Sequence, residues 1–315
     1  MTSRYEVRQE SEGAFPRVLY GFYGRLPRNA FIMIYRVCID ETSSHRERGT
    51  PLLLSGAVAS VSNWERFNVK WHRMLNSLGV SYMRAHELVR CKGEFDGASV
   101  EEQLAAGSAA DAIIRQHVRF GFSTVLWPQE FATYRDDTGS GLNSILDSDF
   151  GVSFRVALSF LQFNISLATG DKNPSVYILV EDGHENSGAA AEVFRQYKKQ
   201  FAPDNVVKAV ALVEKEECYG SQAADLRGFV YMANERQGTP QYTETSREDE
   251  RVVRKMFEEE KPAWIRLQIN RGELMDLRNS VILSRPKFEK RFGHLLVKNS
   301  SPAASACEPS SSRSS

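Results

Sequence analysis

Residues 31–60 read FIMIYRVCID ETSSHRERGT PLLLSGAVAS. The first and third blocks of ten are continuous apolar runs, which are typical of strands buried on both faces of a sheet. The middle block is polar and ends in Gly-Thr, as the loop of a hairpin would. This stretch therefore predicts two antiparallel strands, 31–40 and 51–60, that open a mixed sheet.

The rest of the chain alternates helical and strand patterns. The segment after the hairpin has apolar residues at spacings of three and four, which predicts a helix with Ser62 as its N-cap and Gly79 as its stop. Further helices are expected at about 99–118, 143–169, 186–200 and 218–236, and further strands at 120–127, 175–180 and 206–213. Strands that alternate with helices predict a layered α/β fold, here a mixed five-stranded sheet flanked by helices.

The composition excludes several classes of protein. The chain has 315 residues, of which 42% are apolar, and its 40 basic and 40 acidic residues balance. A neutral total argues against coating nucleic acid by bulk charge, although a local basic groove stays open. Four separate cysteines without a CxxC pair argue against a zinc ribbon and fit a reducing compartment. We expect a cytoplasmic protein without a membrane partner, because no secretory signal or membrane-spanning run is evident; the oligomeric state stays open.

Three acidic residues occupy positions where they could meet. Asp40 directly follows the first strand, and Glu181 leaves the fourth strand in the same way. Asp225 lies in a helix of small and apolar residues, where a buried carboxylate needs a cation or strong hydrogen-bond donors. Oxygen ligands of this kind suit Mg²⁺ or Mn²⁺, and two such ions can promote phosphodiester cleavage. The alternative is that these acids only cap the turns that follow their strands.

Three motifs in the right order resemble the family known as domain of unknown function 3800, over about residues 33–236. They are Ile39-Asp40-Glu41-Thr42 with the following Leu-Ser-Gly-Ala-Val strand, Val180-Glu181-Asp182-Gly183-His184, and Gln222-Ala223-Ala224-Asp225-Leu226. The family is viewed as ribonuclease H-like, with its acids as a two-metal site. The resemblance implies this fold and assigns Asp40 and Asp225 most directly. Thr42 and Ser43 stand where Ser and Gly are usual, which leaves the conformation of that loop open.

The resemblance also implies roles for the candidate site residues. Asp40, Glu181 and Asp225 are the expected catalytic residues, and Glu41 joins them as an expected metal ligand because it matches the acidic second position. Glu181 is chosen over Asp182 because it leaves its strand as Asp40 leaves the first. Residues that could assist around the acids are Asp182, His184, Gln222, His86 and Glu87. A loop histidine that bonds backbone is the simpler interpretation of His184.

The domain organisation follows from the same patterns. We expect an N-terminal arm (1–30), a ribonuclease H-like domain (31–240), a C-terminal helical extension (241–298) and a disordered Ser/Ala/Pro tail (299–315). The extension holds a basic cluster with interleaved aromatics, formed by Arg285, Lys287, Phe288, Lys290, Arg291 and Phe292. It is interpreted as an amphipathic helix rather than a nucleic-acid contact.

Three hypotheses for function remain. The first is a nuclease or phosphoryl-transfer enzyme that depends on Mg²⁺ or Mn²⁺ and has nucleic acid or a small phosphorylated compound as substrate. The second is a catalytically inactive ribonuclease H-like binding module. The third is a defence or mobile-element accessory protein that acts through a partner. No P-loop, GxSxG or HExxH motif supports other chemistry.

Overall fold

The computed structural model describes residues 33–42, 50–138, 148–182 and 188–235, together with shorter pieces between 248 and 290. The opening hairpin is present as expected: β1 (Ile34–Thr42) and β2 (Leu52–Ser60) pair antiparallel, with Asp40 opposite Ser55. The arm 1–30 and the tail 299–315 lie outside the described residues, so the expectations for them stay predictions.

The strands form one mixed sheet of six strands in the order β5-β4-β1-β2-β3-β6. The strands beyond the hairpin are β3 (Phe120–Leu126), β4 (Ser175–Glu181), β5 (Val207–Val213) and β6 (Trp264–Ile269). Beta1, β4 and β5 run parallel to one another, whereas β2 is antiparallel to both β1 and β3. The α/β class and the mixed sheet are confirmed.

The predicted count of five strands is wrong. Beta6 pairs parallel to β3 at the edge of the sheet, inside the segment for which only helices were expected. Its sequence, WIRLQI, buries Ile265, Leu267 and Ile269 and alternates them with Arg266 and Gln268. This is the two-residue period of a half-buried strand, but it lasts for only six residues beside heavily charged sequence.

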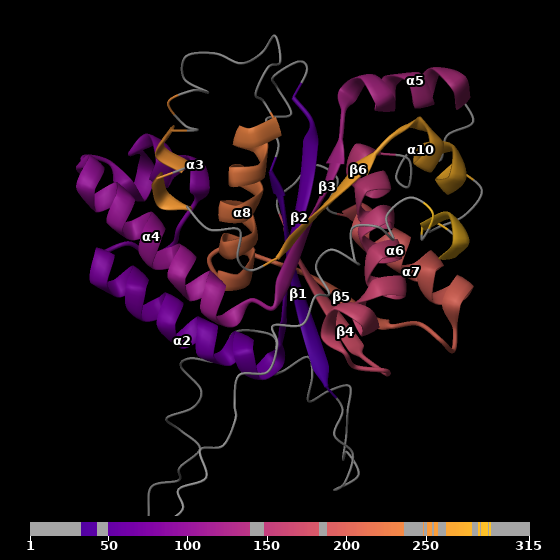
Figure 1. The fold of residues 1–315 in the computed structure, drawn as a ribbon, viewed down its shortest axis with the longest axis horizontal. Helices are drawn as coiled ribbons and strands as arrows, with labels where there is room; N and C mark the ends of the chain where they lie inside the picture. The colour runs from indigo at the N-terminus through magenta and orange to yellow at the C-terminus, as the bar shows by residue number, and fades with distance from the viewer. Residues whose placement is uncertain are drawn as a thin grey trace, which may run out of the picture.

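Helices cover both faces of the sheet (Figure 1). One layer contains α2 (Val61–Leu78), α3 (Ala85–Arg90), the short 3-10 helix η2 (Gly93–Phe95), α4 (Val100–His117) and α8 (Tyr219–Glu235). The other contains α5 (Pro128–Thr138), α6 (Asp149–Thr169), α7 (Gly188–Phe201) and α10 (Arg271–Arg278). Each layer has its own apolar core, because side chains that alternate along a strand point to opposite faces.

The helix α2 shows how closely a sequence pattern locates an element. Its buried residues include Trp64, Phe67 and Trp71, and Gly79 ends it in the left-handed conformation with φ of 71°. The N-cap is Ser60 rather than the expected Ser62, since the Ser60 hydroxyl accepts the backbone N–H of Asn63. The hairpin therefore passes into α2 without an intervening loop.

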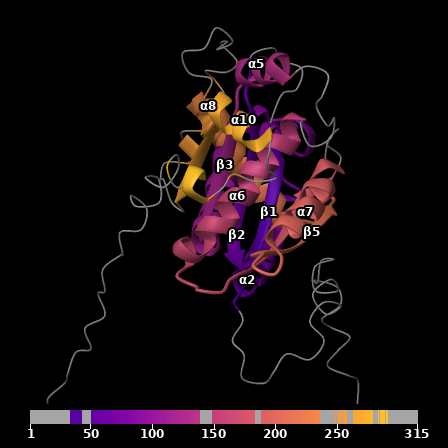
Figure 2. The same ribbon diagram turned by 90° about the vertical axis from the view of Figure 1, so that its right-hand side faces the viewer.

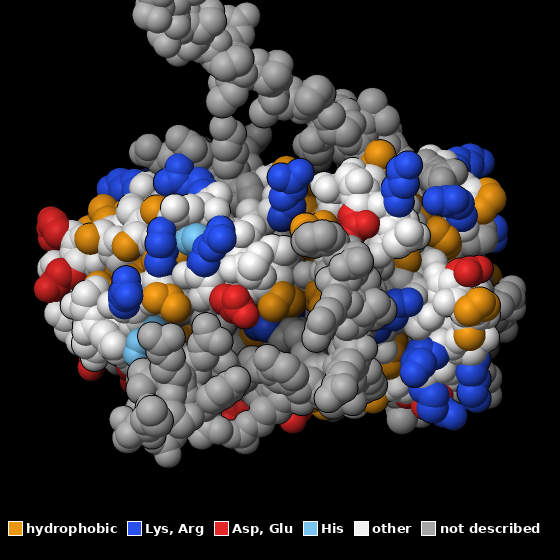
Figure 3. Space-filling view, turned by 90° about the horizontal axis from the view of Figure 1, so that it is seen from below, with side chains coloured by type: hydrophobic (Ala, Val, Ile, Leu, Met, Phe, Trp, Pro, Cys, Tyr) orange, Lys and Arg blue, Asp and Glu red, His pale blue; other side chains and the backbone are white. Residues whose placement is uncertain are grey.

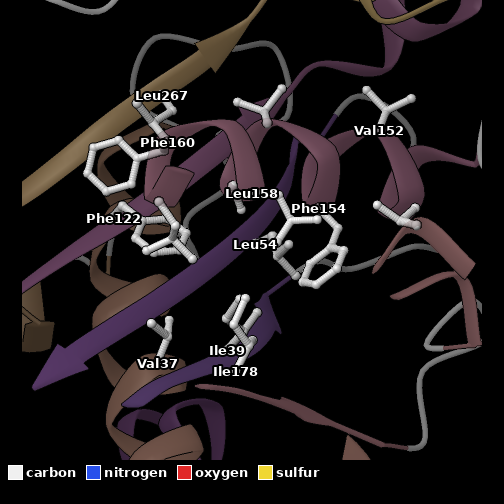
Figure 4. Close-up of a cluster of buried hydrophobic side chains, with 14 of the residues drawn as sticks. Val37, Ile39, Leu54, Phe122, Val152, Phe154, Leu158, Phe160, Ile178 and Leu267 are labelled. Carbon is white, nitrogen blue, oxygen red and sulfur yellow. The ribbon is translucent and has the colours of Figure 1, made fainter. Parts of the chain in front are cut away.

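Helix α6 is the centre of the second layer (Figure 2). Figure 4 shows Phe154, Leu158 and Phe160 of this helix beside sheet residues that include Leu54 and Phe122. The rings of Phe160 and Phe122 lie 5.2 Å apart. By length and composition alone, α6 could cross a membrane, but 78% of its most apolar 18-residue stretch is buried inside the protein. It packs as a core helix.

Candidate functional site

The acidic residues meet where three parallel strands end. Asp40 lies near the end of β1, and Glu181 is the last residue of the neighbouring β4. Cys38 and Leu179, two residues earlier in each strand, belong to the core beneath α8, so alternation directs both carboxylates to the α8 face. Asp225 approaches the same point from α8 itself. The structure thus brings Asp40, Glu181 and Asp225 together.

A lysine lies at the centre of these acids. Lys215, two residues beyond β5, places its Nζ 2.9 Å from Glu181 Oε2, 3.3 Å from Asp40 Oδ1 and 3.5 Å from Asp225 Oδ2. The four side chains are at most 10% exposed. We call Asp40, Glu181, Asp225 and Lys215 the acid–lysine cluster.

Burial changes the protonation of this cluster. It raises the pKa of Glu181 to about 9, with a further contribution from the hydrogen bond to Asp40 and the charge of that residue. Burial also raises the pKa of Asp40 to about 6, against the opposing effect of Lys215. Burial alone would lower the pKa of Lys215, but Asp225, Asp40 and Glu181 together raise it. One ammonium cannot balance three carboxylates. With a pKa of about 9, Glu181 keeps its proton at neutral pH, which lowers the negative charge of the cluster.

Backbone donors and an amide side chain hold the cluster in place. Asp225 Oδ2 accepts the N–H of Ala85 at 2.8 Å. Gln222 Oε1 accepts from Trp71 Nε1 at 2.9 Å and from Met83 N at 3.1 Å, while its Nε2 donates to the Lys215 carbonyl at 3.1 Å. Gln222 is fully buried and uses these contacts to join α2, the segment before α3 and the Lys215 loop. It is a positioning residue.

Close packing of α8 on the sheet requires glycine. A Cβ on Gly228 would lie 2.4 Å from Thr42 Oγ1 and 2.8 Å from Ser55 Oγ, both of which belong to the opening hairpin. A Cβ on Gly220 would lie 2.3 Å from Cys38 Sγ. Only residues without side chains bring the helix, and with it Asp225, this close to β1.

Glu41, Glu87, His86 and Asp182 have surroundings of their own. Glu41 is buried, but alternation places it on the opposite face of β1, with Val37 and Ile39. Glu87 is buried and accepts the N–H of Glu94 at 3.4 Å, and the adjacent His86 is 53% exposed. Asp182 is exposed, and its N–H bonds the Val213 carbonyl. His184 lies outside the described residues.

Lys215 is the residue that the sequence interpretation missed. It sits in Val213-Glu214-Lys215-Glu216-Glu217, which reads as a solvated charge run. The one available signal was position: Ala211 and Val213 lie on the α8 face of β5, and Lys215 follows in the turn that leads from this strand into α8.

The basic cluster of the extension packs through its aromatic side. Phe288 is fully buried in the core beside α6, while Arg285, Lys287 and Lys290 are exposed. Lys287 pairs with Asp276, and the Arg285 guanidinium lies 5.9 Å from the centre of the Phe163 ring. These contacts support the amphipathic-helix interpretation; Arg291 and Phe292 lie outside the described residues.

The oxygen atoms of Asp40, Glu181 and Asp225 are suitable ligands for a hard divalent cation, but the Lys215 ammonium occupies the position between them. Three carboxylates supply only oxygen ligands, as Mg²⁺ and Mn²⁺ prefer. Yet within the described part of the chain, no three His, Cys, Asp or Glu side chains are arranged to hold a metal ion. The carboxylates surround an ammonium group at ion-pair distances, so a metal would need Lys215 to move aside.

No protein-family model matches this chain, and no curated protein matches its sequence.

Proposed function

We propose that this chain is a divalent-metal-dependent phosphoryl-transfer enzyme of the ribonuclease H-like class that cleaves nucleic-acid phosphodiesters. The observation that carries the proposal is the convergence of Asp40, Glu181 and Asp225 on one cation position at the ends of parallel strands. The strand order, with β2 and β3 on one side of β1 and β4 and β5 on the other, supports the fold assignment. Beta6 is an addition at the edge.

In this proposal the three carboxylates would be the metal ligands, the Ala85 N–H holds Asp225 in position, and Gln222 fixes the loop that carries Lys215. A bound Mg²⁺ or Mn²⁺ would supply activation of water and charge stabilisation at the phosphate. Without metal, Lys215 holds the three side chains together, and with a metal in its place its ammonium would be available to a phosphate oxygen. A divalent cation held there would lower the pKa of Glu181 and favour its carboxylate form as a ligand.

Substrate binding in this proposal depends on local rather than total charge. On the face shown in Figure 3, which lies away from the strand ends that carry the cluster, lysine and arginine side chains are scattered, with acidic side chains between them. Near the cluster, Arg84 lies 3.6 Å from Glu216 and is 38% exposed, on the segment that leads to Ala85. We propose that Arg84 contacts the phosphate backbone of the substrate. We also propose that the protein works in the cytoplasm.

A second candidate function is the inactive binding module, whether or not it serves a defence or mobile element through a partner. The observation that favours it is the burial of Lys215 among the three acids, because an internal ammonium together with a proton on Glu181 offsets most of their negative charge without a metal. In that case the cluster fixes α8 to β1, β4 and the Lys215 loop and binds no metal.

One experiment separates the two. Purified protein is incubated with single- and double-stranded DNA and RNA in Mg²⁺, Mn²⁺ or EDTA, alongside D40N, D225N and the control D136N, whose aspartate is exposed on α5. The enzyme proposal expects metal-dependent cleavage that D40N and D225N reduce at least about a hundredfold and D136N leaves unchanged. Cleavage that survives in D40N would contradict it. The inactive module would be favoured if neither single- nor double-stranded DNA or RNA were cleaved and if metal left the stability of the protein unchanged.

A further inference from the structure

Two reduced cysteines face each other beside the acid–lysine cluster, one of them two residues before Asp40 on the same face of β1. Cys38 of β1 and Cys218, the residue before α8, are 180 positions apart in the chain, and their sulfur atoms are 3.8 Å apart. Both are free thiols and almost fully buried, at 1% and 6% exposure. A disulfide requires about 2.05 Å between sulfurs, so the two atoms need to approach by about 1.8 Å, the difference between the two distances.

The fold brings these thiols together by two local features. Gly220, in the first turn of α8, leaves space for the Cys38 side chain, because a Cβ there would overlap its sulfur. The Cys218 carbonyl accepts the N–H groups of Ser221 at 2.9 Å and Gln222 at 3.4 Å, which begins the helix at this cysteine. Cys218 therefore lies at a helix N-terminus, where the aligned peptide dipoles favour a thiolate.

The surroundings also activate one of the two thiols. The hydrogen bond with Cys38, together with the Ser221 N–H and the buried guanidinium of Arg36, lowers the pKa of Cys218 to about 7, against the opposing effect of burial. A thiolate with a resolving thiol beside it is the usual arrangement of a redox-sensitive pair. Cys91, the other described cysteine, is half-buried and lacks such a neighbour among the described cysteines.

We propose that Cys38 and Cys218 are a redox modification site that forms an intramolecular disulfide on exposure to hydroperoxide. The Cys218 thiolate attacks one peroxide oxygen, which gives a sulfenic acid and, after protonation of the leaving oxygen, one water. The Cys38 sulfur then attacks the sulfenic sulfur, the S–O bond breaks, and a second water leaves as an S–S bond forms. Two thiols lose two electrons and two protons, and one hydrogen peroxide becomes two waters.

The bond would tie β1 covalently to the start of α8. Asp40 follows Cys38 by two residues, and Gln222 and Asp225 follow Cys218 by four and seven. Oxidation therefore fixes the two elements that carry two of the three acids. The two thiols can pair whether or not the cluster binds metal, because none of the acids takes part in the reaction.

The test uses the full chain with Cys91 and Cys307 changed to serine, so that only the pair can react within one molecule. The protein is treated with hydrogen peroxide, unfolded, alkylated and digested with trypsin. The expected product is a cross-linked pair of peptides, 37–46 with 216–227, whose mass is about 2 Da below the sum of the two thiol peptides because two hydrogens are lost. Dithiothreitol should separate the peptides, and the oxidised protein should melt at a higher temperature than the reduced protein.

Two outcomes would overturn the proposal. One is full alkylation of both cysteines after peroxide treatment that oxidises a small-molecule thiol completely. The other is accumulation of sulfinic acid at Cys218 without the cross-link, which would show that Cys38 cannot resolve the sulfenic acid. A C38S variant in the same background keeps only Cys218 and is expected to stop at the sulfenic or sulfinic stage; a Cys218 that stays fully reduced there under the same treatment would equally overturn the proposal. The readout involves no metal or substrate, so its failure is distinct from failure of the proposed function.

Discussion

The Lys215 ammonium lies 2.9 Å from Glu181 Oε2, inside a group of three carboxylates that are almost completely buried. A lysine in this position performs the electrostatic role that a metal ion would perform, because buried carboxylates need positive charge close to them. The fold therefore stabilises the cluster without an external ligand. Any metal that binds must compete with an internal cation.

The substitution Lys215→Met tests this competition. In metal-free buffer it should destabilise the protein by about 3 kcal/mol, because the acids lose their buried partner. In Mg²⁺ or Mn²⁺ the increase in melting temperature should be larger than in the wild type, because the cation no longer displaces an ammonium. Lys172→Met, at an exposed position, serves as the control. If metal raised the melting temperature equally in the wild type, Lys215→Met and Lys172→Met, the cation would bind somewhere other than the acid–lysine cluster.

Asp225→Asn should abolish stabilisation by metal. The amide is nearly isosteric and its oxygen still accepts the Ala85 N–H, but it removes one charged ligand. For the wild type, a metal at a hundredfold excess over Kd adds about 2.7 kcal/mol to the free energy of unfolding. Differential scanning calorimetry with and without Mn²⁺ measures the gain. A gain in the variant as large as in the wild type would exclude Asp225 as a ligand.

The stability of the metal-free protein should fall as pH rises from about 5 to about 9. Glu181 has a pKa of about 9 in the folded protein against 4.5 as its ordinary value, so the folded state binds the extra proton within this window. The stability that this proton provides is complete below the ordinary pKa and is lost as pH rises through the folded one. The slope cannot exceed about 1.4 kcal/mol per pH unit for one proton.

Glu181→Gln should flatten that dependence, because glutamine cannot release a proton. Urea denaturation at each pH unit from 5 to 9, on wild type and variant, measures the difference between the two slopes. Parallel curves would show that Glu181 titrates normally in the folded protein and would remove the electrostatic argument for an under-neutralised cluster.

Gly228→Ala tests the close approach of α8 to the hairpin. The new methyl would overlap Thr42 and Ser55, so the helix must shift, and we expect a loss of about 1–3 kcal/mol in urea denaturation. Gly188→Ala, at the open start of α7, is the matched control and should be neutral or stabilising. A G228A protein as stable as the control would mean that α8 has room to move away from the sheet.

Much of the architecture was predictable because local patterns determine it. The runs at 31–40 and 51–60 gave a correct hairpin, and Gly79 marked the end of α2. The cap was wrong by two residues, because Ser60 and Ser62 both satisfy the pattern and only the observed Ser60–Asn63 bond distinguishes them. The edge strand β6 was missed because pairing with β3, rather than local sequence, defines it.

The acids of the site were predictable, but their partner was not. Asp40 and Glu181 stand at the ends of strands that the sequence identifies, whereas their spatial relation to Lys215 depends on the order of β5, β4 and β1 in the sheet. Strand order arises from tertiary packing and is not encoded in the spacing of charged residues. Glu41 differs from Asp40 in its surroundings, because strand alternation places these sequence neighbours on opposite faces of β1.

Because β4 lies far from β1 in the sequence, β1 cannot complete its pairing until late in synthesis. Ile34 pairs with Ser175, so one edge of the first strand waits for about 140 further residues before its neighbour exists. At about 5–20 residues per second this lasts about 7–28 s on the ribosome. Throughout that time an apolar hairpin presents open backbone donors and acceptors, which is a hazard for intermolecular strand pairing. The open edge of β1 is therefore most exposed to intermolecular pairing in the interval before β4 emerges.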